Sequence, residues 1–244
     1  EEKIAKVIYC DNMASIRKNV SSFLKNASLL RFLKINSANT LKIETTNNKI
    51  ISTFEIAFDD KNNKLVALNS TKTPFYKSKG SQWFWYDYQE KENTLYIRYK
   101  NCSSREHLTK HKDFFKVTDE ILEKTPYFKP FSDSIISILN NKKINKIVFD
   151  FRGNTGGSSV QGTELIKEVK NTIAIKNNAK VFTLIDRYVF SSAIINSLDT
   201  AQYLNTTFVG ESTSGSPNHF GELKNFELPK SKLSLSYSTK YFKS

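Results

Sequence analysis

The sequence of 244 residues contains no apolar run of 18 residues, so no membrane-spanning helix is predicted. Its first residues, Glu1-Glu-Lys-Ile, lack the apolar core of a signal peptide. Cysteine is scarce: Cys10 and Cys102 lie far apart with no metal-type spacing, and the sequence leaves open whether they pair. These absences exclude a membrane-spanning protein and a cysteine-rich metal or disulfide scaffold.

Histidine is also rare, with three in the chain. His107 and His111 stand four residues apart, a spacing that can bind metal on a helix. The pair lacks the glutamate of a zincin motif and lies in a strongly polar stretch. We therefore expect an exposed pair, and no metal site.

The formal net charge of +13 comes mostly from lysines that are spread through nearly every segment. A nucleic-acid interface would gather Lys and Arg on one element with aromatic residues between them. We therefore expect a solvated, lysine-rich surface and no nucleic-acid partner, with an anionic partner such as a cell surface or an acidic protein as the alternative. Aromatic residues make up 13% of the chain, which is at odds with disorder.

The first part of the chain, residues 1–90, is predicted to be a smaller α+β portion. Helical spacing of apolar residues over 13–35 gives way to short β-like runs over 40–100, including Lys64-Leu-Val-Ala-Leu. Turns rich in Asn, Asp, Lys and Gly separate these runs, which is typical of antiparallel strands.

The second part, residues 91–244, is predicted to be an α/β domain. Two amphipathic helices are expected over 112–140, split around Pro126 and Pro130. Apolar strands then alternate with helices, a pattern that predicts a parallel sheet with covered faces. The expected elements are strands at Lys146–Phe151, Val181–Ile185 and Thr207–Gly210, helices over 159–172 and 191–203, and a closing hairpin of Glu222–Leu228 with Leu233–Tyr237.

Two polar motifs follow neighbouring strands of this predicted sheet. Asp150-Phe-Arg-Gly-Asn-Thr-Gly-Gly157 ends the first strand, and its glycine pair permits a sharp turn that leaves backbone N–H groups pointing outward. Such groups bind phosphate or stabilise an oxyanion, although neither a Walker A nor a Rossmann pattern is present. Ser191 begins the helix after the next strand, where it is either a helix N-cap or a nucleophile. Both motifs lie at the carboxyl ends of strands, where sites form in open α/β sheets, which favours the nucleophile.

A third polar loop, Val209–Glu222, should reach the same edge of the sheet. It carries His219, the only imidazole that follows Ser191, and general bases are most often histidine. His219 is therefore a candidate catalytic residue, with a loop residue of no chemical role as the alternative.

The order of these motifs resembles the tail-specific (C-terminal-processing) proteases, the S41 serine peptidases. Asp-x-Arg-x-Asn-x-Gly-Gly, Asp-Arg-x-x-x-Ser-Ser-Ala and Val-Gly-Glu-x-Thr-x-Gly occur in sequence, and Leu95-Tyr-Ile-Arg-Tyr-Lys-Asn-Cys102 is similar to a Firmicute-type branch. The resemblance covers about 90–244. It implies a crotonase-like α/β fold, an extracytoplasmic location, a protein or peptide substrate and no cofactor.

Carried over by position, the resemblance implies that Ser191 is the nucleophile and that the backbone N–H groups of Gly157 and Ser192 form the oxyanion hole. The sequence departs from the family at Ser216, where the processing proteases have a lysine that acts as general base. Three explanations stay open: a histidine in an upstream segment, substitution by His219, or loss of catalysis.

We therefore predict a serine-type peptidase that forms an acyl-enzyme on Ser191. The alternative is a catalytically impaired S41-like protein that binds peptides, and a third possibility is an esterase that uses the same serine. Substrate preference and oligomeric state do not follow from the sequence.

Overall fold

The computed structural model describes residues 12–24, 26–47, 50–57 and 73–243. The chain divides into two compact units, Glu1–Thr73 and Pro74–Ser244, and each is considered by itself. Among the described residues, no helix combines the length and the apolar character that crossing a membrane requires.

The described residues of the first unit form two short helices and a two-stranded antiparallel hairpin. These elements are α2 (Met13–Leu24), α3 (Ala27–Phe32), β1 (Thr40–Asn47) and β2 (Ile50–Ala57). The helical pattern over 13–35 forms two helices because the Asn26 side chain accepts a hydrogen bond from the Leu29 N–H at 2.9 Å and starts a new helix. The predicted run at Lys64 and the thiol of Cys10 lie outside the described residues.

The second unit is built on a five-stranded sheet in the order β3-β4-β5-β6-β7. The β3–β4 pair is antiparallel and the other three pairs are parallel. Its strands are β3 (Phe84–Gln89), β4 (Thr94–Tyr99), β5 (Lys146–Asp150), β6 (Lys180–Ile185) and β7 (Thr207–Gly210). This mixed α/β architecture with a mostly parallel sheet confirms the predicted fold class.

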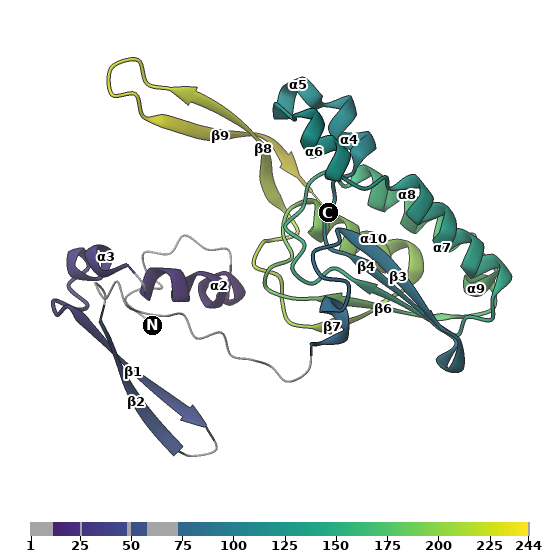
Figure 1. Cartoon of the computed structure of the whole chain (residues 1–244), viewed down its shortest axis with the longest axis horizontal. Coiled ribbons are helices and arrows are strands. Elements are labelled where there is room, and N and C mark those ends of the chain that lie inside the picture. Colours follow the sequence, from purple (N-terminus) through teal and green to yellow (C-terminus); the bar gives the residue numbers. More distant parts are fainter. Residues whose placement is uncertain (1–11, 25, 48–49, 58–72, 244) are drawn as a thin grey trace. The chain divides into compact units, whose positions relative to one another are not determined.

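The helices of the second unit follow the predicted alternation, and α7 and α8 run along the same side of the sheet (Figure 1). They are α4 (Arg105–Lys110), α5 (Lys112–Phe115), α6 (Asp119–Lys124), α7 (Lys129–Asn141), α8 (Val160–Lys170), α9 (Ile173–Lys176) and α10 (Ser192–Leu204), with short 3-10 turns at Phe75–Lys77 and Glu90–Glu92. Pro130 lies in the first turn of α7, where the missing N–H removes no helical hydrogen bond.

Strand β4, the second in the sheet, is buried on both faces, and its alternation separates two environments. Leu95, Ile97 and Tyr99 belong to the main hydrophobic core, together with residues of β5, α7 and α8. Tyr96 and Arg98 point to the opposite face, where they contact Asp150 of β5. One face of the strand therefore builds the core and the other positions polar groups at the carboxyl edge of the sheet.

The boundary between the units differs from the predicted division at 90/91. β3 lies before that position, yet it pairs with β4 along its whole length and packs Phe84 into the main core. Strand pairing and apolar burial therefore assign β3 to the second unit, which begins at Pro74.

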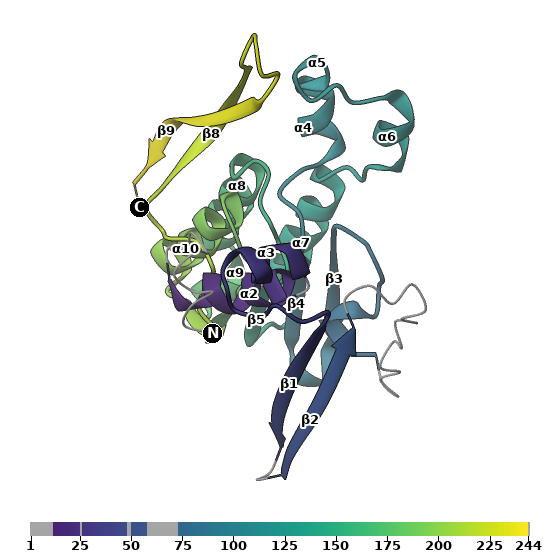
Figure 2. The same cartoon turned by 90° about the vertical axis from the view of Figure 1, so that its left-hand side faces the viewer.

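The closing hairpin is longer than predicted and consists of β8 (His219–Glu227) and β9 (Ser234–Phe242). It forms a sheet of its own and extends away from the five-stranded sheet (Figures 1 and 2). His219 is the first residue of β8, so this hairpin begins where the third polar loop ends.

Candidate functional site

Ser191 adopts a backbone conformation that few residues other than glycine tolerate. Its φ is 53° and its ψ is −128°, and the Ala193 N–H donates to the Phe190 carbonyl at 3.1 Å. These values place Ser191 at the second position of a tight turn of type II′, where the Cβ of an ordinary residue is strained. Its hydroxyl makes no hydrogen bond with the described residues, so Ser191 does not act as a side-chain N-cap of α10.

Gly156 makes close approach to this turn possible. A Cβ at Gly156, where φ is +105°, would lie 2.9 Å from the Cβ of Ser191 and 3.0 Å from the Phe190 carbonyl oxygen. Glycine is therefore required here, because it lets the loop after β5 touch the turn after β6. The two motifs that the sequence placed at one edge are in direct contact.

The side chain of Ser192 joins the same two loops. Its hydroxyl donates to the Gly157 carbonyl at 2.8 Å. The backbone N–H groups of Gly157 and Ser192 themselves donate to no acceptor among the described residues. The structure thus brings Ser191, Gly157 and Ser192 together, with two uncommitted backbone donors near the serine.

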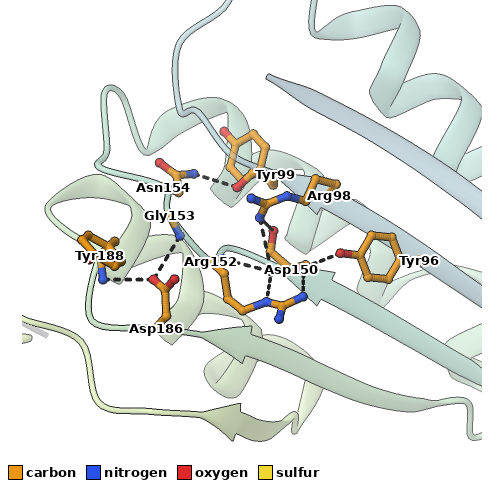
Figure 3. Close-up of polar contacts among 9 residues, drawn as sticks. All are labelled: Tyr96, Arg98, Tyr99, Asp150, Arg152, Gly153, Asn154, Asp186 and Tyr188. Atoms are coloured by element: carbon orange, nitrogen blue, oxygen red, sulfur yellow. Dashed lines mark hydrogen bonds and ion pairs between the residues drawn. The ribbon is translucent and has the colours of Figure 1, made fainter. Parts of the chain in front are cut away.

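Asn154 and Asp186 hold these loops in place, and neither was a candidate from the sequence. The Asn154 amide donates to the Tyr99 carbonyl at 2.9 Å, while its side-chain oxygen accepts from the Gly156 N–H at 2.9 Å. Asp186 accepts from the N–H groups of Gly153 and Tyr188, each at 3.0 Å (Figure 3). Their signal in the sequence is a short polar side chain in the loop that follows a strand: Asp186 comes directly after β6, and Asn154 lies in the loop after β5. Such side chains are typical of loop-organising residues.

A buried ionic cluster lies beside these loops at the end of β5. The Asp150 carboxylate, which is fully buried, accepts hydrogen bonds from Tyr96, from Arg98 at 3.2 Å and from the Arg152 guanidinium at 2.6 and 2.9 Å (Figure 3). Burial and the hydrogen bond to Asp150 raise the pKa of Tyr96 above its usual value. Because every partner is committed to Asp150, this cluster positions the loop and is not itself poised for proton transfer.

The polar loop after β7 packs next to the nucleophile turn. A Cβ at Gly215 would lie 2.9 Å from both the Phe190 ring and the Ile194 side chain, which flank Ser191 in the chain. Ser216 follows directly, so the residue at the family's lysine position belongs to a loop that contacts this turn. Arg187 and Glu211 add a two-point ion pair, at 2.9 and 2.8 Å, between the loops after β6 and β7.

His219 is not hydrogen-bonded to Ser191. Its Nδ1 lies 3.1 Å from the Ser216 carbonyl and 3.2 Å from the Pro217 carbonyl, and its ring stacks on Phe242. A hydrogen bond from Nδ1 to these carbonyls leaves Nε2 as the acceptor nitrogen, which is the tautomer that a general base needs.

Two cavities flank the Gly153–Ser158 loop. One, of about 360 Å³, is lined by Ser158 together with His107, His111 and Gln161. The other, of about 240 Å³, is lined by Gly153 together with Arg98, Arg152 and Tyr188. His107 is half-buried, and burial together with the charges of His111 and Lys110 lowers its pKa, so this residue differs from the exposed one that the sequence predicted.

Cys102 is a free, fully buried thiol in this region. Burial raises its pKa to about 12, so it is not a nucleophile near neutral pH. Among the described residues, no group of three or more His, Cys, Asp or Glu side chains is arranged to hold a metal ion.

Comparison with known proteins gives no match to a family model and none to a curated protein. Among solved structures, the chain is similar to a lipoprotein from Streptococcus agalactiae, with 15% identity, a TM-score of 0.40, and coverage of 65% of this chain and 58% of that one. It is also similar to the photosystem II D1 C-terminal processing protease, with 12% identity, a TM-score of 0.38, and coverage of 61% and 37%. A third similar structure is a protein from Bacteroides fragilis provisionally named an S41 protease, with 12% identity, a TM-score of 0.38, and coverage of 86% and 56%. The chain therefore spans less than two thirds of the length of each of these structures.

Proposed function

We propose that this protein is a serine-type hydrolase of peptide bonds with Ser191 as its nucleophile. The observation that carries the proposal is the unpaired Ser191 hydroxyl on a strained turn, with one uncommitted backbone N–H at Ser192 in the same turn and another at Gly157 in the loop packed against it. A strained, exposed hydroxyl at the carboxyl edge of a parallel sheet is typical of nucleophiles rather than of N-caps. The resemblance to S41 peptidases supports the same role.

In this proposal the N–H groups of Gly157 and Ser192 stabilise the oxyanion. Attack of the Ser191 hydroxyl on a peptide carbonyl places negative charge on the carbonyl oxygen, and the departing amine leaves an acyl-enzyme that water hydrolyses. Removing one preorganised donor of this kind costs about 3 kcal/mol of transition-state stabilisation. The Ser192 hydroxyl supports the arrangement, because its hydrogen bond to the Gly157 carbonyl fixes that peptide unit.

His219 is the proposed proton acceptor. Its Nδ1 contacts with two carbonyls favour an unprotonated Nε2, and this atom would take the Ser191 proton directly or through one water. Because His219 and Ser191 are not hydrogen-bonded to each other, the proposal requires either a bridging water or a movement of the β8 end of the loop toward the serine on substrate binding.

A second candidate function is peptide binding without catalysis, and one observation favours it. Ser216 occupies the position of the family's lysine, on a loop that packs against the nucleophile turn, and a serine there cannot accept the proton at neutral pH. The peptide would then bind next to Ser191 and dissociate uncleaved. Esterase activity is a further alternative, in which activated esters but no peptides are cleaved. An extracytoplasmic location is proposed from the resemblance alone.

A serine-reactive phosphonate probe separates these functions. For a hydrolase we expect the wild-type chain to be labelled, with the adduct mapped to Ser191 by mass spectrometry, and Ser191→Ala to be unlabelled with an unchanged circular dichroism spectrum. Ser212→Ala is the matched control, because Ser212 is an exposed serine on the neighbouring loop and its loss should leave labelling intact. Labelling of Ser191→Ala equal to that of the wild type would eliminate Ser191 as the nucleophile.

Two further variants test the base. If His219 accepts the proton, His219→Ala lowers the labelling rate by about 100-fold. If the chain lacks a working base, His219→Ala changes nothing, and Ser216→Lys raises the labelling rate because it supplies an amine on the adjacent loop. A rate that responds to neither variant would favour the binding function.

A further inference from the structure

The cavity of about 240 Å³ at the carboxyl edge of the sheet, called the basic pocket below, is lined by Lys77, Arg98, Lys100 and Arg152 around the ring of Tyr76, with Asp186 at its rim. The geometry points to this pocket as a subsite that binds a carboxylate of the peptide, either an acidic side chain or a free C-terminus. This inference rests on the proposed function in one respect: that function is the reason for expecting the ligand to be a peptide.

The positive charge of the pocket is not balanced by its own carboxylate. Four cationic side chains line it, and the single lining carboxylate, Asp186, already accepts two backbone N–H groups. Lys77 and Lys100 are exposed and form no ion pair with the described residues. Asp150 and Asp186 together carry two negative charges against the four cations, which leaves an excess of two positive charges that attracts an anion.

The two guanidinium groups are held rigidly before any ligand arrives. Asp150 binds Arg98 and Arg152 from beneath, and the Tyr76 ring lies 4.2 Å from the Arg152 guanidinium and 5.6 Å from that of Arg98 (Figure 3 shows the Asp150 contacts). Arg98 is nearly fully buried, so the partly exposed Arg152 is the guanidinium group that offers donors to a ligand. Donors fixed in advance bind an anion without the entropy loss of ordering long side chains.

A carboxylate fits this pocket for two reasons. Planar guanidinium groups match the planar carboxylate, and carboxylates are the anions that an unmodified peptide carries. The remaining walls include Trp85 and Tyr188, whose rings suit the methylene groups that precede a carboxylate.

The pocket lies within reach of a peptide held at Ser191. Tyr188, in its wall, is three residues before Ser191, so their Cα atoms are at most about 11 Å apart. An extended peptide covers that distance with three to four residues. The recognised carboxylate therefore lies a few residues from the bond that the serine would attack.

The test measures peptide binding to the full chain carrying Ser191→Ala. Fluorescence anisotropy monitors the binding at a physiological salt concentration of about 0.15 M. The probes are fluorescein-labelled alanine–serine octapeptides: one with Glu and an amidated C-terminus, its Gln counterpart, and one with Ala and a free C-terminus. We expect a carboxylate-bearing peptide to bind about tenfold more tightly than the Gln amide. Preference for the Glu amide identifies a side-chain carboxylate, and preference for the free C-terminus identifies the terminal one.

Adding Lys77→Met and Lys100→Met together should reduce that preference to less than about twofold, because both lysines are exposed and form no ion pair with the described residues. Lys77 also makes a ring contact, with its ammonium 5.5 Å from the centroid of the Tyr76 ring. The matched control, Lys91→Met with Lys230→Met, removes the same charge from exposed positions outside the pocket and should keep the preference. Equal binding of all three peptides would overturn the proposal that the pocket binds a carboxylate. An equal loss of the carboxylate preference in both double variants would overturn it as well. Failure of phosphonate labelling with the preference intact would instead overturn the hydrolase proposal and leave the pocket standing.

Discussion

Asp150 and Ser191 both lie where strands of the parallel sheet end, yet their side-chain oxygens differ in burial and in hydrogen bonding. The Asp150 carboxylate is fully buried and bonded to one phenol and two guanidinium groups, whereas the Ser191 hydroxyl is partly exposed and has no hydrogen bond among the described residues. The strain differs as well, since Ser191 has a φ of 53°. A committed, buried group stabilises the edge, and an uncommitted, strained group at the same edge is available for chemistry.

The largest expected effect comes from Asp150→Asn, which tests the first half of this comparison. The change keeps the shape of the side chain but removes the charge that compensates Arg98 and Arg152. Breaking a buried ion pair from one side costs about 3 kcal/mol or more, so the free energy of unfolding should fall by that amount in urea denaturation. Asp133→Asn is the control, because its pair with Lys129 is exposed to solvent and should contribute little to stability. Equal losses in the two variants would mean that the cluster does not stabilise the edge.

Gly156→Ala tests whether the serine depends on close approach of the two loops. A Cβ there would overlap the Ser191 Cβ and the Phe190 carbonyl, so we expect a loss of about 2 kcal/mol of stability and a loss of phosphonate labelling. Gly153→Ala, three residues earlier, has φ +72° but no atom within 4 Å of the new Cβ. It should cost about 1 kcal/mol of backbone strain and keep the labelling. If both variants retain labelling, the contact between the loops is not needed to present the serine.

Much of this contrast was accessible from the sequence, because each motif follows an apolar strand. The runs at Lys146 and Val181 predict β5 and β6, and parallel pairing then places Gly157 and Ser191 at one edge. Local patterns therefore predicted the α/β class and the meeting of the two loops.

The sequence did not predict the backbone strain at Ser191 or the contacts of Asp150 with Tyr96, Arg98 and Arg152. A serine before a helix is normally an N-cap in extended conformation, and only the turn closed by Ala193 and Phe190 gives it a positive φ. The cluster depends on the register that sets Arg98 opposite Asp150, two residues that are 52 positions apart in the chain. The predicted division at 90/91 falls in the short turn Glu90–Glu92 that joins β3 to β4, although the two strands pair along their whole length. The strand pattern identifies both strands but does not say to which unit each belongs.

Ser191→Gly measures the strain that the comparison assigns to the serine. Glycine adopts this φ without the penalty of a Cβ, whereas alanine retains it. Unfolding of Ser191→Gly should therefore require about 1 kcal/mol more than unfolding of Ser191→Ala, measured in the same denaturant series. The two variants are equally unable to form an acyl-enzyme, so they separate strain from chemistry. If their stabilities are equal, the turn is relaxed and the conformation of Ser191 says nothing about function.

Glu106 extends the comparison to a carboxylate of intermediate kind, bonded but exposed. Its side chain accepts hydrogen bonds from the N–H groups of Phe128 at 3.0 Å and Lys129 at 3.1 Å, at the start of α7. Burial alone would raise the pKa of Glu106, but these backbone hydrogen bonds outweigh it and lower the pKa below its usual value. Because the folded-state pKa lies below the unfolded-state pKa, the charged form stabilises the fold at neutral pH, and this contribution disappears as the pH falls through the folded-state pKa.

Glu106→Gln should accordingly be less stable than the wild type by at most about 1 kcal/mol at pH 7, the size of a typical capping interaction. The difference should shrink as the pH falls through the lowered folded-state pKa, because the wild-type carboxyl then becomes protonated as well. Urea denaturation of both proteins over a series of acidic pH values measures it. A difference independent of pH would mean that the shape of the side chain, and not its charge, holds the start of α7. The charge of a carboxylate would then stabilise this fold only where the group is buried, as at Asp150. The charge of an exposed carboxylate such as Glu106 would contribute little to stability.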